Sequence, residues 1–250
     1  MKKTPQIGVP AARNQGTRGF TLLEMLISLL VLAVVSGAVF AQINRMQQRS
    51  NSEAIKVDIS QQAREFLDET VRDLHMAGYP NASMYSNPAA YPSKVAVGLV
   101  SVSPTQILLE GDVNNDGNVY SVKIWYVAAD PNDPNCPCIR RSAVPKIDAD
   151  SFSQPTTPNY TETQYVLPPG TGTGQSGEDL FTYYDQIGNP VVIAGGVDIR
   201  TPGGVNTPSG QTLISSIKTV KINLSLLGAH DPETNSTITR TSMSATARLN

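Results

Sequence analysis

The feature that most constrains this chain is a long segment close to its N-terminus, residues 20–43, that is apolar except for one carboxylate and a few small polar residues. A helix over these residues spans roughly 36 Å, at a rise of about 1.5 Å per residue, which is enough to cross the hydrocarbon core of a bilayer. The preceding residues, 1–19, carry four basic side chains and no acidic one. The positive-inside tendency therefore predicts residues 1–19 in the cytoplasm and the rest of the chain outside it.

A single carboxylate, Glu24, lies early in the apolar segment. A charged group in hydrocarbon is costly unless it is paired, and the residues four positions away, Phe20 and Ser28, are uncharged. Three interpretations stay open: a secretory signal cut near Ala41, a plain membrane anchor, or a segment cut before Phe20. Only the last explains Glu24, because the new α-amino group of one copy can pair with Glu24 of the next copy in a staggered stack of helices.

Residues 19–24 read Gly-Phe-Thr-Leu-Leu-Glu and directly follow the basic leader. This stretch resembles the processing motif of type IV prepilins, G-F-T-L-x-E. The resemblance implies that a prepilin peptidase cuts between Gly19 and Phe20 on the cytoplasmic face and N-methylates Phe20. It also implies that Glu24, with Thr21 beside it, sets the axial register of parallel helices in a filament.

The apolar segment is predicted to continue as one helix through residues 44–78, an amphipathic half that follows the transmembrane and filament-core half. No proline interrupts residues 20–77, and Gly78 and Pro80 are typical of a helix end. A coiled-coil seam would need a longer repeat, so we expect the stripe to pack on the chain's own sheet. The stripe repeats at spacings of three and four: Ile55, Ile59, Ala63, Phe66, Thr70, Val71 and Leu74.

The remainder, residues 79–250, is predicted to form a β-rich globular domain outside the cytoplasm. One strand has a clearly apolar face, formed by Val220, Ile222, Leu224 and Leu226. Residues 146–179 are rich in Pro, Thr and Gly and are predicted to be a long irregular loop. The fold class is therefore α+β, a pilin-like lollipop in which a long N-terminal helix packs on an antiparallel sheet. Candidate strands are 95–102, 106–112, 119–128, 139–144, 180–184, 190–194, 213–227 and 237–249.

Asp112, Asn114 and Asp116 alternate before Gly117, as do the first ligands of a calcium loop. The twelfth position is Lys123 instead of the expected glutamate, and the flanking segments read as strands. The same residues are typical of a hairpin turn, in which Asn and Asp accept local backbone hydrogen bonds. The turn is the favoured interpretation, and calcium is the one cofactor left open.

The two cysteines, Cys136 and Cys138, flank Pro137. They close a small disulfide ring, stay free thiols, or meet an outside partner, a cysteine or a metal; a bridge between residues two apart fits poorly with an extended strand. With only His75 and His230 in the chain, a histidine-based metal centre is not expected.

No pattern in the sequence predicts an enzyme. The Gly-rich run at residues 170–177 lacks the Lys-Ser/Thr ending of a phosphate-binding loop, and no nucleophile elbow or paired histidine motif is present. Without residues 1–19 the chain has 15 basic and 21 acidic residues, so its net charge is −6 and no nucleic-acid site is expected.

Two later features, Leu180–Asp185 with Gly188 and the final residues 247–250, resemble the larger minor pilins of the PilW type and the J-type pseudopilin of type II secretion. The resemblance implies a minor or tip subunit of a type IV pilus. Its implied partners are the prepilin peptidase, other pilins and an inner-membrane assembly platform, with the chain first in the inner membrane and then in a pilus or pseudopilus. The alternatives are a type II secretion pseudopilin and a membrane-anchored, calcium-dependent adhesion protein.

Overall fold

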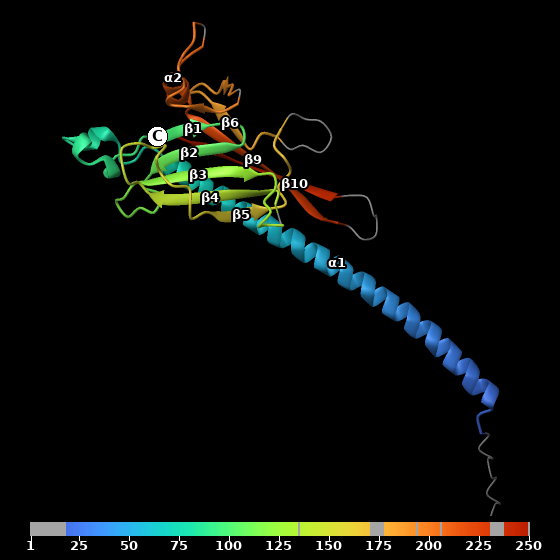
Figure 1. Ribbon diagram of the computed structural model, residues 1–250. Helices are drawn as coiled ribbons and strands as arrows, with labels where there is room; N and C mark the ends of the chain where they lie inside the picture. The colour runs from blue at the N-terminus through green and yellow to red at the C-terminus, as the bar shows by residue number, and fades with distance from the viewer. Residues whose placement is uncertain are drawn as a thin grey trace, which may run out of the picture. The chain divides into compact units, whose positions relative to one another are not determined.

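The computed structural model describes residues 19–134, 136–170, 178–193, 195–205, 207–230 and 238–249 (Figure 1). The chain divides into two compact units, Met1–Gln48 and Arg49–Asn250. Helix α1 (Leu22–Met76, 55 residues) contributes to both units, which confirms the single long helix expected from the sequence. Antiparallel sheets follow it, so the architecture is α+β and pilin-like, as predicted.

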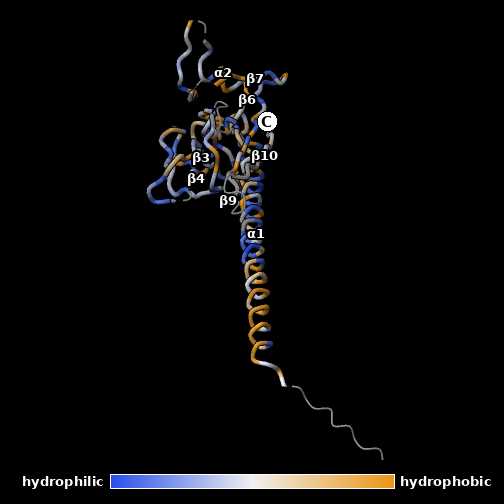
Figure 2. The backbone as a smooth tube through the Cα atoms, turned by 90° about the vertical axis from the view of Figure 1, so that its right-hand side faces the viewer, coloured by the Kyte–Doolittle hydropathy of each residue, from blue (hydrophilic) through white to orange (hydrophobic). Residues whose placement is uncertain are grey.

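In the first unit, α1 presents apolar side chains over its whole circumference. Figure 2 shows this part of the tube as almost continuously hydrophobic. Its most apolar window of 18 residues has a mean hydropathy of 2.5, and none of it is buried within the chain. Among the described residues, α1 is the one helix long and apolar enough to cross a membrane. A surface of this kind is stable only when lipid or other helices cover it.

Helix α1 ends where the sequence predicts. Gly78 has a φ of 82°, the left-handed conformation that glycine adopts at a helix end. Its backbone N–H donates to the Glu110 carbonyl at 2.9 Å, and Ala77 forms an isolated bridge with Gly111. The end of the helix is therefore hydrogen-bonded directly to the sheet.

Six strands of the second unit form an antiparallel sheet in the order β5-β4-β3-β2-β1-β8. Three short 3-10 helices lie between α1 and β1: η1 (Ala82–Met84), η2 (Pro88–Ala90) and η3 (Pro92–Lys94). The strands are β1 (Leu99–Val102), β2 (Gln106–Gly111), β3 (Tyr120–Val127), β4 (Cys138–Pro145), β5 (Tyr160–Gln164) and β8 (Val197–Asp198).

The other four strands form a second antiparallel sheet in the order β10-β9-β6-β7. They are β6 (Phe181–Tyr184), β7 (Pro190–Val191), β9 (Thr219–His230) and β10 (Ile238–Arg248). A short helix, α2 (Gly210–Ser216), precedes β9. Thus most of the predicted strands are present, with shifted ends.

The core of the second unit lies between the C-terminal part of α1, from Ile59 onward, and the two sheets. The helix contributes the predicted stripe, of which Ile59, Ala63, Phe66, Thr70 and Leu74 are buried and Val71 is half-buried. The side chain of Ile55 lies outside the described residues. The predicted apolar face of β9 is also confirmed, because Val220, Ile222, Leu224 and Leu226 are all at most 1% exposed.

The irregular loop predicted at residues 146–179 is interrupted by a strand and is partly packed, so the prediction needs correction there. Strand β5 lies within it, and Val166 pairs with Leu226 of β9. Polar side chains here are buried because they bond to each other and to the backbone: Gln154 accepts from the Ile147 N–H at 2.9 Å and donates to Asp148 at 3.1 Å. Residues 171–177 lie outside the described part of the chain.

The strand predicted at residues 213–227 also needs correction, because its first residues belong to α2. Ser209 caps this helix by accepting a hydrogen bond from the Thr212 N–H at 3.3 Å. Ile214 and Ile217 are buried on one side of it. The cap and the local spacing of these apolar residues produce a helical turn before β9 begins at Thr219.

Candidate processing and assembly site

The site predicted from the sequence lies at the start of α1. Gly19 and Phe20 precede the first helical residue, and Thr21 occupies the N-cap position. The Thr21 carbonyl accepts from the backbone N–H groups of Glu24 and Met25, at 3.0 and 3.2 Å. The Thr21 hydroxyl also accepts from the Glu24 N–H at 3.3 Å. A threonine cap of this kind stabilises a helix start by about 1 kcal/mol, so the helix begins immediately after the proposed cleavage point.

The bond between Gly19 and Phe20 is accessible in the first unit. Both residues are exposed, Phe20 at 75%, and neither is part of the helix. A Cβ atom added at Gly19 would meet no atom within 4 Å. The chain itself therefore does not require glycine at this position, and a requirement for glycine would come from the enzyme that cuts there.

Glu24 is the third residue of the first helical turn. A carboxylate at this end of a helix interacts favourably with the helix dipole. Its backbone carbonyl accepts a hydrogen bond from the Ser28 hydroxyl at 2.8 Å. Among the described residues, no ion pair involves the Glu24 carboxylate, which is exposed.

Residues 14–40 match the family model of the prokaryotic N-terminal methylation motif. The match includes the proposed cleavage point, Thr21, Glu24 and most of the apolar helix. It supports a type IV pilin-like protein, a pilin or pseudopilin, that is a substrate of prepilin peptidase and assembles with other pilins. No curated protein and no solved structure matches the chain.

The second predicted site, at Asp112 to Asp116, lies in the hairpin between β2 and β3. The two carboxylate oxygens of Asp112 accept from the N–H groups of Asp116 and Gly117, at 3.0 and 2.9 Å. Asp116 accepts from the Asn118 N–H and from the Tyr120 hydroxyl, each at 2.8 Å, and the tyrosine bond lowers the pKa of Asp116. Gly117 has a φ of 78°, as the turn interpretation requires. These are the contacts of a hairpin turn, and calcium binding here, with Asn114 as a further ligand, stays a prediction.

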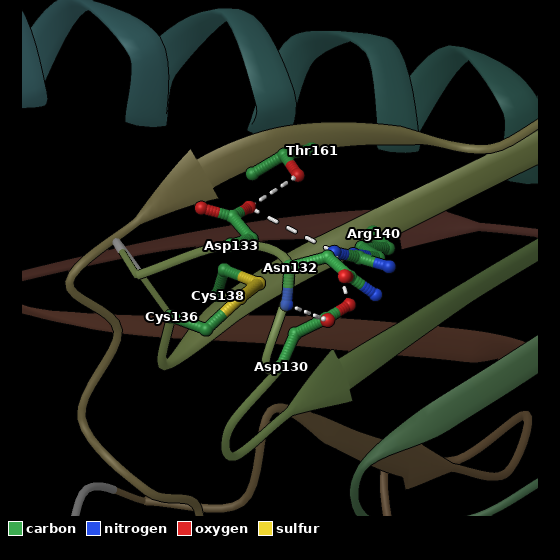
Figure 3. The surroundings of a disulfide bond; sticks show 7 residues. All are labelled: Asp130, Asn132, Asp133, Cys136, Cys138, Arg140 and Thr161. Carbon is green, nitrogen blue, oxygen red and sulfur yellow. Dashed lines mark hydrogen bonds and ion pairs between the residues drawn. A yellow bond between two sulfur atoms is a disulfide. The ribbon is translucent and has the colours of Figure 1, made fainter.

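Cys136 and Cys138 are joined by a disulfide, with their Cα atoms 4.4 Å apart (Figure 3). Asp133 lies within 4.8 Å of both sulfur atoms. This group does not form a thiolate metal site, because the sulfurs are bonded to each other. The positive charge beside Asp133 comes from Arg140, which lies 3.8 Å from Asp133 and 2.6 Å from Asp130. The disulfide and these ion pairs hold the loop before β4 against that strand.

The structure also contains buried charges that the sequence reasoning missed, at the contact between α1 and β4. Arg141 binds Asp73 through two nitrogens, at 2.8 and 2.9 Å, and Glu69 at 3.2 Å. Asp73 is fully buried. A signal was present, because Asp73 lies seven residues after Phe66 and therefore on the apolar stripe.

A second buried ion pair binds the backbone of the segment between η3 and β1. Lys146 binds Glu110 at 2.7 Å, and both side chains are at most 3% exposed. The Lys146 ammonium also donates to the Val95 carbonyl at 2.9 Å, and Glu110 accepts from the Val97 N–H at 3.1 Å. Charge-assisted hydrogen bonds therefore stabilise the connection between η3 and β1.

Burial raises the pKa of Asp73 from 3.8 to about 6, because desolvation outweighs the attraction of Arg141. The folded protein therefore binds a proton at Asp73 more tightly than the unfolded chain does. The stability that this proton contributes is complete below pH 3.8 and is lost as the pH rises through about 6. We expect the unfolding free energy to fall by about 3 kcal/mol across this range.

Urea unfolding of the detergent-solubilised chain between pH 4 and 7 measures this slope. Asp73→Asn should flatten most of it, while Asp68→Asn, at an exposed position of the same helix, should keep it. Burial also raises the pKa of Glu162, which adds a slope of the same sign. An unchanged slope in Asp73→Asn would contradict this assignment.

Proposed function

We propose that this protein is a minor subunit of a type IV pilus. One observation carries the proposal: an exposed Gly19–Phe20 bond lies directly before a capped helix with a largely apolar surface and one early carboxylate, Glu24. Each part has a role in filament assembly, and a plain anchor needs neither the carboxylate nor the motif.

The proposed mechanism is assembly after processing. Prepilin peptidase cuts after Gly19 and methylates Phe20, and residues 20–43 hold the mature chain in the inner membrane with its globular unit outside. The apolar helix then moves from lipid into a bundle of similar helices. There the Glu24 carboxylate meets the α-amino group of a neighbouring subunit, and this pairing sets the axial register.

The size of the globular unit supports a minor or tip subunit. It contains a six-stranded and a four-stranded sheet. Finding this chain as the main mass of purified filaments would contradict that role.

The second candidate is a type II secretion pseudopilin, which the same N-terminal match supports. Deletion of the gene separates the two. Loss of twitching and DNA uptake would support the pilus, and loss of exoprotein release would support the pseudopilus.

Intact-mass analysis tests the proposal most directly. When the chain is produced with its own prepilin peptidase, we expect a product that begins at N-methylated Phe20. Gly19→Val should leave the precursor uncut, because the branched side chain obstructs the peptidase and not the fold of this chain. Gly37→Ala is the matched control, since a Cβ at this helical position meets no atom within 4 Å. An uncut wild-type chain, or one cut near Ala41, would overturn the proposal.

A further inference from the structure

The four outer edges of the two sheets differ greatly in length. Three edge strands are short: β5 has five residues, β7 has two and β8 has two. The fourth, β10, has eleven residues and pairs along its length with β9 alone (Figure 1). The edge of β10 that points away from β9 presents a row of backbone N–H and C=O groups. No backbone hydrogen bond joins this side to another described residue.

The central residues of β10 lack the features that usually protect an exposed edge. Residues 242–247 read Ser-Met-Ser-Ala-Thr-Ala, with no charge, proline or glycine. The irregularity in its pairing is confined to the start of the strand, between Ile238 and Arg240. Proteins normally protect long edges with lysine, proline, bulges or short strands, because an unprotected edge pairs with other strands.

The two faces of β10 are already suited to continue the sheet. Met243 and Ala245 pack against the core and Ala247 is buried, while Ser242, Ser244 and Thr246 are exposed on the opposite face. A strand added beside β10 would need small or apolar residues on the first face and polar residues on the second. These requirements describe an ordinary half-buried strand.

Charge argues against a second copy of the same chain as the added strand. A symmetric antiparallel pair centred on Ser244 uses the whole uncharged run, and it places Arg248 opposite position 240, which is also arginine. Like charges directly opposite each other destabilise strand pairs. A different strand with a carboxylate opposite Arg248, which is exposed, forms a favourable pair instead.

We propose that β10 is an interaction edge to which a different subunit of the assembly adds one strand. This inference rests on the proposed function in placing that strand in a neighbouring subunit. The partner strand is uncharged at its centre, has small or apolar residues on the face that continues Met243 and Ala245, and carries a carboxylate at its end. Main-chain hydrogen bonds provide the affinity, and the alternating side chains provide the specificity.

Amide hydrogen exchange measures this pairing directly. In the detergent-purified chain, about half of the amides of residues 242–248 should exchange slowly, through bonds to β9, and the outward half quickly. In envelope fractions of cells that contain the whole assembly, we expect the outward half to slow about 100-fold. Ser244→Lys should abolish the slowing. The control variant Ile187→Lys changes a residue that is 82% exposed in the loop between β6 and β7, and it should leave the slowing intact.

Intact-mass analysis of the same samples distinguishes a failure of the proposed pilus function from a failure of the β10 inference. A chain cut at Phe20 whose outward β10 amides still exchange quickly in the envelope overturns this inference and leaves the proposed function standing. An uncut chain overturns the proposed function, and slow exchange in that sample would mean a partner outside a filament, against the inference. Slowing that grows with the concentration of the purified chain would show pairing between copies, which also contradicts it.

Discussion

A Gly111→Ala variant is expected to lose at least about 3 kcal/mol of unfolding free energy, the upper part of the range for overpacked positions. A Cβ atom at this position would overlap the Met76 carbonyl group, with its carbon at 2.8 Å and the Ala77 nitrogen at 3.2 Å. These are backbone atoms at the end of α1, so no side chain can rotate to make room.

The surrounding hydrogen bonds prevent the two segments from separating. Ala77 and Gly111 form a β-bridge. The backbone N–H of Gly78 donates to the Glu110 carbonyl at 2.9 Å, and the backbone N–H of Asp112 donates to the Tyr79 carbonyl at 2.9 Å. Relief of the overlap therefore requires loss of several of these bonds. The cost is large compared with the roughly 5–15 kcal/mol that stabilises a typical domain.

Thermal and urea unfolding of the detergent-solubilised chain would measure the loss. For a unit of this size we expect the melting temperature to fall by about 6–12 °C. Gly196→Ala is the matched control, because its added Cβ meets no atom within 4 Å. Equal stability of the two variants would show that α1 does not pack on β2 as closely as described.

Glu24→Ala is expected to reduce incorporation into filaments at least about 10-fold while cleavage and membrane insertion continue. In the proposed assembly, the variant would leave the α-amino group of a neighbouring subunit without a partner in an apolar environment. Removal of one member of a buried ion pair costs about 3–5 kcal/mol, which is more than a 10-fold effect requires. The helix itself should persist, because the Thr21 cap is retained and alanine is a strong helix former.

Quantification of the mature chain in sheared filaments and in membranes would test this. Ser28→Ala is the control, because it removes a hydroxyl that donates to the Glu24 carbonyl, on the same side of the helix, and changes no charge. Normal incorporation of Glu24→Ala would support a plain membrane anchor. Loss of cleavage in the same variant would show that Glu24 acts in processing and would leave its role in register untested by this variant.

The long N-terminal helix could be predicted closely because its determinants are local. The absence of proline from residues 20–77, the repeat from Ile59 to Leu74 and the Gly78 signal define α1 almost to the residue. The residues of the processing motif are adjacent in the chain, so their order is visible without any tertiary structure. The alternation in β9 likewise depends only on neighbours two residues apart.

The errors fall where contacts between distant residues decide the structure. Strand β5 is polar, and it becomes a strand because β4 offers it a paired edge. Residues 213–216 include the β-branched Ile214 but form the end of α2, because Ser209 caps a helix there.

The sequence by itself determined the helix, the processing motif and the α+β class, because helix formation and peptidase recognition depend on residues close together in the chain. Only the tertiary structure decided where the buried charges lie. Arg141 and Asp73 are 68 residues apart, and Lys146 and Glu110 are 36 apart, so no local pattern pairs them. The exposed edge of β10 is likewise a property of sheet order, which arises from the packing of the ten described strands and not from the composition of one.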